Sequence, residues 1–238
     1  MIFVPGFMQK GDAWSPVGEL VGQRYPSAYL DFRTHSFEAR LGELRQAAQP
    51  GAVVVGYSMG GRLALHLAVR EPDRLAGLVT VGASPGIDDP EERRRRAEDD
   101  ARLAAWMEQS TIEEVVARWE GLPVFADQPA ELVEAQRRGR LEHDPRLLAT
   151  LLRSAGQGVL PGIWDELRRI RAPVLALAGE RDKRYIAAAR RIALLAPRGD
   201  ALPVMGAGHA AHLERPDVVA SLVLEFLDQH FGQGGVVD

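Results

Sequence analysis

Three residues of the chain have the types and the order that serine-based catalysis requires. The first is Ser58, in the G-x-S-x-G pattern Gly56-Tyr-Ser-Met-Gly60, directly after an apolar run and directly before a helical pattern. A nucleophile elbow holds its serine in a strained turn between strand and helix, and small flanking residues permit the close backbone approach there. Both flanking positions are Gly, so the pattern favours an elbow over a chance Gly-Ser turn.

An acid and a base follow in the chain. Asp182 stands in the loop GERD after an apolar run, and His209 stands in the Gly-rich loop MGAGHAAH before the last helical pattern. In the order Ser, Asp, His, the acid orients the imidazole and the imidazole takes the serine proton. Glu180 is the competing carboxylate and His212 the nearest rival base. The other histidines lack this loop context and are interpreted as structural or exposed: His35, His66, His143 and His230.

Two backbone N–H groups are candidates for an oxyanion hole. Met59 begins the helix after the serine, where N-terminal amides point toward developing negative charge. Phe7 lies in the turn VPGFM after the first apolar run, the place from which a second donor is expected. We therefore predict that the Met59 and Phe7 amides form this hole.

The elements that position these groups are read from hydrophobic patterning. Short apolar runs bounded by Gly or Pro predict buried strands at 2–4, 52–55, 75–81 and 174–178, and helical patterns at 62–69 and 218–226 alternate with them. This alternation predicts an α/β fold with a mostly parallel sheet. Between 86 and 166 it gives way to charged, helix-rich sequence, which predicts a helical cap (86–166) inserted into a single core domain (1–85 and 167–238).

Composition narrows the classes of function. The net charge is −4 and there is no Cys, which argues against nucleic-acid partners, disulfides and thiolate metal sites. There is no metal-ligand spacing, phosphate loop or dinucleotide fingerprint, so we predict no metal and no cofactor. No run approaches the roughly 20 apolar residues of a membrane span, so we expect a cytoplasmic protein without membrane contact. The tail GQGGVVD has the composition of a loose end.

The residues described so far, together with motifs of the cap, resemble a known family. The motifs are PGFMQKGDAW, GYSMGGR, RWEGLPVF, AQRRGRL, GQGVLPGIW, GERD and AGHAAHLERP. They resemble the 2-succinyl-6-hydroxy-2,4-cyclohexadiene-1-carboxylate (SHCHC) synthases of menaquinone biosynthesis, which are lyases with the α/β-hydrolase fold. The resemblance implies elimination of pyruvate from 2-succinyl-5-enolpyruvyl-6-hydroxy-3-cyclohexene-1-carboxylate, a small polycarboxylate.

The resemblance also implies a set of substrate-binding residues. Arg62, Trp119 and Arg140 match family positions that bind substrate carboxylates, and guanidinium groups suit carboxylates because their geometries match. A further family Arg falls in the run 93–96, which we interpret as mostly solvated; Arg96 is chosen because RAED follows it. Tyr57 matches an active-site tyrosine, although packing also explains a Tyr there. Without the resemblance, a structural ion pair explains Arg62 equally well.

The chain departs from the family pattern in two ways. Pro5 stands where many relatives carry His before the oxyanion Gly. The chain also begins at the strand that leads into that loop, so the first two strands usual in this fold are missing and six strands are expected. A different edge strand is then exposed, which invites a covering segment or formation of a homo-oligomer.

Two other functions fit the same residues. Ser58 serves equally as the nucleophile of a hydrolase acting on a small acidic substrate, such as a carboxylesterase, lactonase or carbon–carbon bond hydrolase. A non-catalytic ligand-binding module with this fold is the third alternative.

Overall fold

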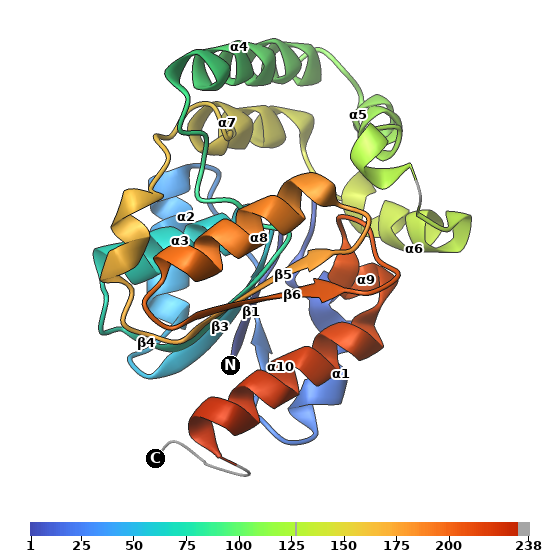
Figure 1. The fold of residues 1–238 in the computed structure, drawn as a ribbon. Coiled ribbons are helices and arrows are strands. Elements are labelled where there is room, and N and C mark those ends of the chain that lie inside the picture. The colour runs from blue at the N-terminus through green and yellow to red at the C-terminus, as the bar shows by residue number, and fades with distance from the viewer. Residues whose placement is uncertain (127, 233–238) are drawn as a thin grey trace.

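Six parallel strands form one sheet in a computed structural model that describes residues 1–126 and 128–232 (Figure 1). The strand order is β2-β1-β3-β4-β5-β6, and every paired neighbour runs parallel. The strands are β1 (Ile2–Val4), β2 (Ala28–Tyr29), β3 (Ala52–Tyr57), β4 (Leu75–Val81), β5 (Val174–Gly179) and β6 (Gly199–Val204). The predicted α/β class, with six strands in a parallel sheet, is confirmed.

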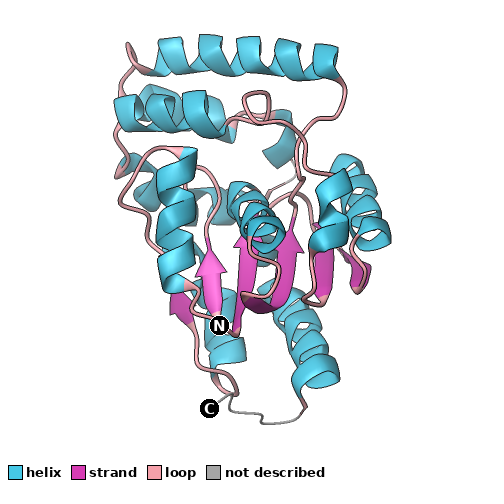
Figure 2. Cartoon of the chain, turned by 90° about the vertical axis from the view of Figure 1, so that its left-hand side faces the viewer, coloured by secondary structure: helices cyan, strands magenta, loops and turns pink. Residues whose placement is uncertain are grey.

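Helices cover both faces of the sheet (Figure 2). The core helices are α1 (Ser15–Gly22), α2 (Phe37–Ala47), α3 (Met59–Arg70), α8 (Lys183–Leu195), α9 (Ala211–Glu214) and α10 (Pro216–Phe231), with 3-10 turns η1 (Gly11–Trp14) and η3 (Asp165–Arg169). Because side chains alternate across a strand, Val54 and Leu78 pack under α2, α3 and α8, whereas Val55 and Val79 pack under α1 and α10. The two apolar faces of each strand explain why both sides are covered.

Four further helices form a layer over the carboxyl ends of the strands, whose arrowheads point toward that layer in Figure 2. They are α4 (Pro90–Met107), α5 (Ile112–Glu120), α6 (Ala130–Leu141) and α7 (Pro145–Ala155), with the turn η2 (Pro123–Phe125). Ala104 and Met107 of α4 and Leu148 of α7 belong to the same apolar cluster as α3. These helices lie within the segment predicted as a cap, and we keep the proposed division into core and cap.

Sequence patterning located four buried strands and missed two others: β6, whose residues are mostly exposed or half-buried, and the short β2. The four predicted strands correspond to β1, β3, β4 and β5, and the two predicted helices to α3 and α10. β2 was not predicted because its two residues are exposed and carry no apolar pattern. It forms the edge of the sheet beyond β1, and so short an edge offers little backbone for pairing. Formation of a homo-oligomer stays a prediction.

In the part of the chain that the structure describes, no helix is long and apolar enough to cross a membrane. The predicted cytoplasmic location stays a prediction. Of the tail predicted to be loose, residues 233–238 lie outside the described residues.

Candidate active site

The turn between β3 and α3 holds Ser58 in a strained backbone conformation. Ser58 has φ +49° and ψ −109°, a left-handed φ that non-glycine residues rarely adopt, and its N–H donates to the Val81 carbonyl at 2.9 Å. A Cβ on Gly60 would lie 2.5 Å from the Val4 and Pro5 carbonyl oxygens, and one on Gly56 would lie 2.7 Å from the Gly61 backbone. Only glycine fits on either side, so the local structure is that of a nucleophile elbow.

Asp182 and His209 are joined by a short hydrogen bond at the same end of the sheet. His209 Nδ1 lies 2.7 Å from Asp182 Oδ2, and both side chains are buried. Asp182 follows β5 and caps α8, and its Oδ1 accepts from the Tyr185 N–H at 3.3 Å. The competing acid, Glu180, is exposed and accepts instead from the Gly206 N–H at 2.9 Å. The geometry therefore pairs His209 with Asp182.

The rival base, His212, has no access to the serine. It is fully buried between the rings of Trp14 and Tyr57, with ring centroids 4.4 and 4.2 Å away. Burial lowers its pKa to about 3, so it is neutral at physiological pH. His212 packs in the core and does not line the cavity.

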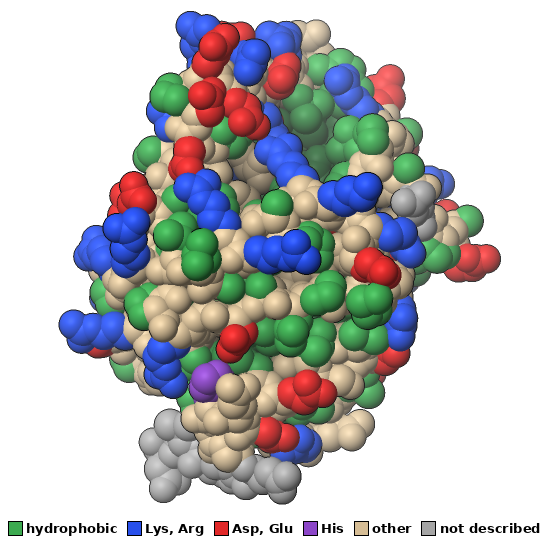
Figure 3. Space-filling view, viewed as in Figure 1, with side chains coloured by type: hydrophobic (Ala, Val, Ile, Leu, Met, Phe, Trp, Pro, Cys, Tyr) green, Lys and Arg blue, Asp and Glu red, His purple; other side chains and the backbone are tan. Residues whose placement is uncertain are grey.

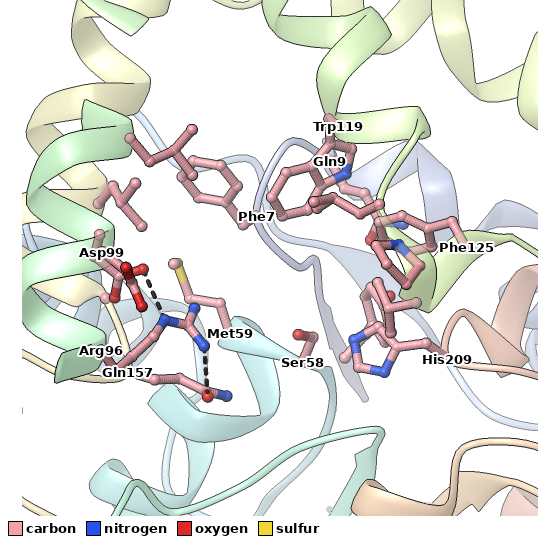
Figure 4. Close-up of a pocket in the computed structure, with 18 of the residues that line it drawn as sticks. Phe7, Gln9, Ser58, Met59, Arg96, Asp99, Trp119, Phe125, Gln157 and His209 are labelled. Atoms are coloured by element: carbon pink, nitrogen blue, oxygen red, sulfur yellow. Dashed lines mark hydrogen bonds and ion pairs between the residues drawn. The ribbon is translucent and has the colours of Figure 1, made fainter. Parts of the chain in front are cut away.

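Ser58 and His209 both border one cavity of about 930 Å³ between the core and the layer of cap helices. Figure 4 shows both residues on the wall of this cavity, with Phe125 next to His209. Among the described residues, the Ser58 hydroxyl forms no hydrogen bond with His209. Catalytic hydrogen bonds often tighten only when substrate binds, so the missing hydrogen bond is compatible with proton transfer from Ser58 to His209.

The predicted oxyanion donors lie beside the serine. Met59 is the first residue of α3, so its N–H has no partner within the helix. Phe7 follows β1, and the neighbouring Gly6 N–H donates to Gln9 Oε1 at 3.2 Å, which fixes the loop that Pro5 enters. Figure 4 shows Phe7 and Met59 on the cavity wall near Ser58. Both residues therefore lie where the oxyanion hole is predicted, and their role as donors stays a proposal.

Arg62 brings a buried positive charge to the cavity. It lies one turn after Ser58 on α3, is 4% exposed and borders the cavity. Its Nη2 donates to the Ala155 carbonyl at the end of α7, while Nη1 is buried without a partner. Burial lowers the pKa of Arg62 to about 10, which still leaves it charged at neutral pH. An unpartnered guanidinium nitrogen in this position favours an anionic ligand.

Arg96 extends from α4 to the cavity, and part of its guanidinium already donates hydrogen bonds within the protein. Its Nε donates to Asp100 at 2.8 Å and its Nη1 to Gln157 Oε1 at 3.3 Å. Arg94 and Arg95 of the same run are exposed. The structure therefore turns Arg96 toward the cavity and its two preceding neighbours toward solvent.

Arg140 and Trp119 line the opposite part of the cavity. Arg140 is 3% exposed, and its Nη1 and Nη2 donate to Glu120 at 3.0 Å and to Gln136 at 2.8 Å. Only its Nε is buried without a partner. Trp119 packs against Phe7 with ring centroids 5.1 Å apart. Arg140 thus has less free hydrogen-bonding capacity than Arg62.

Tyr57 lies under the triad. Its ring is 5.3 Å from His209, and its side chain is almost fully buried on the cavity wall. Burial raises the pKa of Tyr57 well above its usual value, so its hydroxyl stays protonated. All ten residues predicted for the site border this cavity or supply its backbone turns.

Other residues at the cavity were not singled out in the sequence. They include the polar residues Gln9, Arg118, Gln157 and Tyr185. Arg118 stacks on the Trp106 ring, with its guanidinium carbon 4.4 Å from the centroid. Figure 3 shows a hollow beneath α4 with basic side chains at its rim. The signals were faint: Gln157 stands in GQGVLPGIW, and Tyr185 stands three residues after Asp182, in the first turn of α8.

No group of three or more His, Cys, Asp or Glu side chains in the described residues could hold a metal ion. The predicted absence of a cofactor stays a prediction.

Comparison with known proteins places this geometry in a family. A family model described as the alpha/beta hydrolase family matches residues 1–222. The chain belongs to this alpha/beta hydrolase family. Its curated relatives include a Yersinia enterocolitica protein named 2-succinyl-6-hydroxy-2,4-cyclohexadiene-1-carboxylate synthase, 29% identical over 96% of this chain and 86% of the relative. A Bacillus subtilis protein assigned to the same synthase is 36% identical over 73% of this chain, although the match spans only 65% of that relative.

Solved structures agree with this placement in the alpha/beta hydrolase family. MenH from S. aureus superposes with a TM-score of 0.91 at 28% identity, covering 96% of this chain and 93% of MenH. A thermophilic esterase from Thermogutta terrifontis superposes with a TM-score of 0.72 at 26% identity, covering 96% of this chain and 89% of the esterase. The predicted resemblance to the SHCHC synthases is confirmed, and the chain is an enzyme of the α/β-hydrolase fold.

Proposed function

We propose that the chain is a lyase of menaquinone biosynthesis that eliminates pyruvate from 2-succinyl-5-enolpyruvyl-6-hydroxy-3-cyclohexene-1-carboxylate to give SHCHC. The observation that carries this proposal is the Arg62 guanidinium, buried with one free nitrogen in the same cavity as Ser58 and His209. A buried, unpaired cation beside a serine triad fits an acidic substrate better than a neutral ester. The synthase name of the curated relatives supports the same choice.

The chemistry follows from the structures of substrate and product. The product carries double bonds at C2 and C4, so the proton at C2 is lost, the C3=C4 bond shifts, and the C5–O bond to the enolpyruvyl group breaks. The C2 proton is acidic because the succinyl ketone stands on the same carbon. Pyruvate departs as its enolate, which takes up one proton to give the keto acid, so the proton removed at C2 is balanced by the one gained by pyruvate.

The triad supplies the base for this step. His209 takes the Ser58 proton, and the Ser58 oxygen takes the C2 proton, so the charge passes to the imidazolium that Asp182 stabilises. The enolate oxygen of the succinyl group enters the hole formed by the Phe7 and Met59 amides. No acyl intermediate forms, because the substrate offers elimination and not acyl transfer.

The cavity walls hold the carboxylates of the substrate. Arg62 stands nearest the serine in the chain, while Arg96, Arg118 and Arg140 lie on the cap side of the cavity. Each guanidinium offers planar donors that match the geometry of a carboxylate. Trp119 and Phe7 supply an apolar surface for the cyclohexene ring.

A serine hydrolase is the competing function, because the same Ser58 can attack an acyl carbon. Its support is the likeness to the Thermogutta terrifontis esterase. The two functions differ in the bond that breaks, so a product assay separates them.

The deciding experiment measures pyruvate release from the enolpyruvyl substrate by wild type and Ser58→Ala. We expect rapid release by the wild type and a loss of at least about 10²-fold in the variant, since general-base catalysis contributes this much. Short-chain neutral esters are assayed in parallel. Full pyruvate release by Ser58→Ala would reject the mechanism, and ester hydrolysis without pyruvate release would establish the hydrolase.

A further inference from the structure

A chain of hydrogen bonds runs from the cap helix α4 to the cavity wall beside His209. Arg96 Nη1 donates to Gln157 Oε1 at 3.3 Å, and Gln157 Nε2 donates to the Tyr185 hydroxyl oxygen at 2.9 Å. Buried Asp100 anchors the far end by accepting from Arg96 Nε at 2.8 Å. Figure 4 shows the contact between Arg96 and Gln157 at the margin of the cavity. The chain therefore joins α4, the loop after α7 and the start of α8.

The direction of each hydrogen bond follows from Arg96. A guanidinium only donates, so the Gln157 oxygen must face Arg96 and the Gln157 amide nitrogen must face Tyr185. The Tyr185 oxygen is then an acceptor, and its own proton is left to donate elsewhere. Within the described residues no acceptor is hydrogen-bonded to that proton, and Tyr185 borders the cavity. The cavity thus contains an O–H donor with no acceptor among the described residues.

Asp182 fixes the place of this donor relative to the triad. Its Oδ1 accepts the Tyr185 N–H, while its Oδ2 holds His209 Nδ1. The Tyr185 ring also packs on the His209 imidazole, with centroids 4.5 Å apart. One carboxylate therefore positions both the base and the phenol, so a substrate oriented by Tyr185 is also oriented toward His209.

We propose that Tyr185 is a specificity-determining residue that donates its phenolic proton to a carboxylate oxygen of the substrate beside His209. The substrate class rests on the proposed function. Arg96 and Gln157 are positioning residues here, because they act through the Tyr185 hydroxyl, and donation from a cation at the start of such a chain strengthens the donor at its end. The free Tyr185 proton would complement the charge of Arg62 without adding another cation to the cavity.

Two substitutions test this donor in different ways. Tyr185→Phe keeps the ring against His209 and removes the hydroxyl. Gln157→Glu replaces the amide donor with a second acceptor, which would capture the Tyr185 proton and turn it away from the cavity. Tyr29→Phe is the matched control, because Tyr29 lies on the edge strand β2 outside the cavity.

The measurement is the calorimetric affinity of the full chain for 2-succinylbenzoate, a ring that carries a carboxylate and a succinyl group. We expect Kd to rise about 10-fold or more in Tyr185→Phe and in Gln157→Glu, the range for a hydrogen bond to a charged group. The double variant should bind no more weakly than the weaker single one, and Tyr29→Phe should match wild type. Circular dichroism checks that each variant folds; should Gln157→Glu unfold, Tyr185→Phe alone decides.

Unchanged affinity in Tyr185→Phe, or no binding by the wild type, would overturn the proposal. Pyruvate release is assayed separately on the same proteins. If the affinities follow the expected pattern but the wild type releases no pyruvate, the lyase function is rejected. The role of Tyr185 in binding a carboxylate is then still supported.

Discussion

Different interactions build the floor and the roof of the cavity. The floor consists of the loops at the carboxyl ends of the strands, and the roof consists of α4 to α7. On the floor, backbone geometry places the functional groups: Ser58 adopts a left-handed φ, Gly60 admits no Cβ, and Asp182 caps a helix. In the roof, charged side chains hold one another, as in the buried pair of Arg140 and Glu120. The positions of the roof's charged groups therefore depend on side-chain partners, whereas those of the floor depend on backbone geometry.

This difference separates chemistry from specificity. Alpha/beta hydrolases share a floor of this kind and carry out many reactions, so the reaction must be selected by what surrounds the triad. Arg62 connects the two regions, because it lies on the floor helix α3 and donates to the Ala155 carbonyl of the roof. We therefore expect substitutions on the floor and in the roof to change different kinetic constants.

The largest effect is expected on the floor, for Asp182→Asn. The asparagine can still accept the Tyr185 N–H, but it would favour the wrong tautomer of His209 and leave the imidazolium unstabilised. We expect kcat for pyruvate release to fall by about 10³ to 10⁴, with little change in melting temperature. Steady-state kinetics and thermal unfolding measure the two quantities. A loss below 10-fold would show that Asp182 does not orient the base.

A smaller effect, on KM, is expected for Arg62→Met. Methionine fills a similar volume and removes the charge, so KM should rise about 10-fold to 100-fold while kcat changes little. Stability should hold, because the variant no longer buries the cation whose pKa burial lowers to about 10. Arg70→Met is the matched control on the same helix, since Arg70 pairs with Glu38 outside the cavity. An equal rise in KM for both variants would contradict a direct contact with substrate.

The roof is tested by Arg140→Met. The resemblance to SHCHC synthases predicts that Arg140 binds a carboxylate, whereas its contacts with Glu120 and Gln136 favour a structural role. We expect a lower melting temperature, since the buried Arg140–Glu120 pair is lost, but only a partial loss because Glu120 keeps its ion pair with Arg137. The KM rise should be smaller than that of Arg62→Met. Adding Glu120→Gln removes the carboxylate that Arg140 and Arg137 share, so the double variant tests whether Arg140 acts only through Glu120. A KM defect as large as that of Arg62→Met, persisting in the double variant, would assign Arg140 to the substrate.

The contrast between floor and roof also explains what could be predicted from the sequence. Ser58, Asp182 and His209 stand in short motifs at the ends of apolar runs, so local pattern was enough to place them at one edge of the sheet. The link from Arg96 through Gln157 to Tyr185 joins residues up to 89 positions apart and depends on how α4 and α8 pack. Local sequence pattern does not encode how distant helices pack. The family resemblance pointed to Arg96 but not to Gln157 or Tyr185.

The smallest effect is expected from His212, in the packed core beneath the floor. No described residue there could pair with a charged imidazole. Burial lowers the pKa of His212 to about 3, below its usual value of 6.5, so the unfolded chain binds a proton that the folded chain refuses. The stability is therefore complete above pH 6.5 and is lost progressively as the pH falls from 6.5 toward 3. Between pH 6.5 and 5 the loss from this one histidine should reach about 1.5 kcal/mol.

Replacing the His212 ring tests this pH dependence. The quantity compared is the slope of melting temperature against pH, not the melting temperature itself. When the pH is lowered from 6.5 to 5, the melting temperature of His212→Leu should fall by about 3 to 6 °C less than that of wild type. Val219→Ala, in the same apolar cluster, should lower the melting temperature equally at both pH values. His66 and His143, whose pKa values burial lowers to about 4, remain in both proteins and leave a residual slope. Parallel curves for wild type and His212→Leu would mean that the core around Trp14 and Tyr57 accommodates the charged ring, and the contrast with the ion-paired roof would then fail.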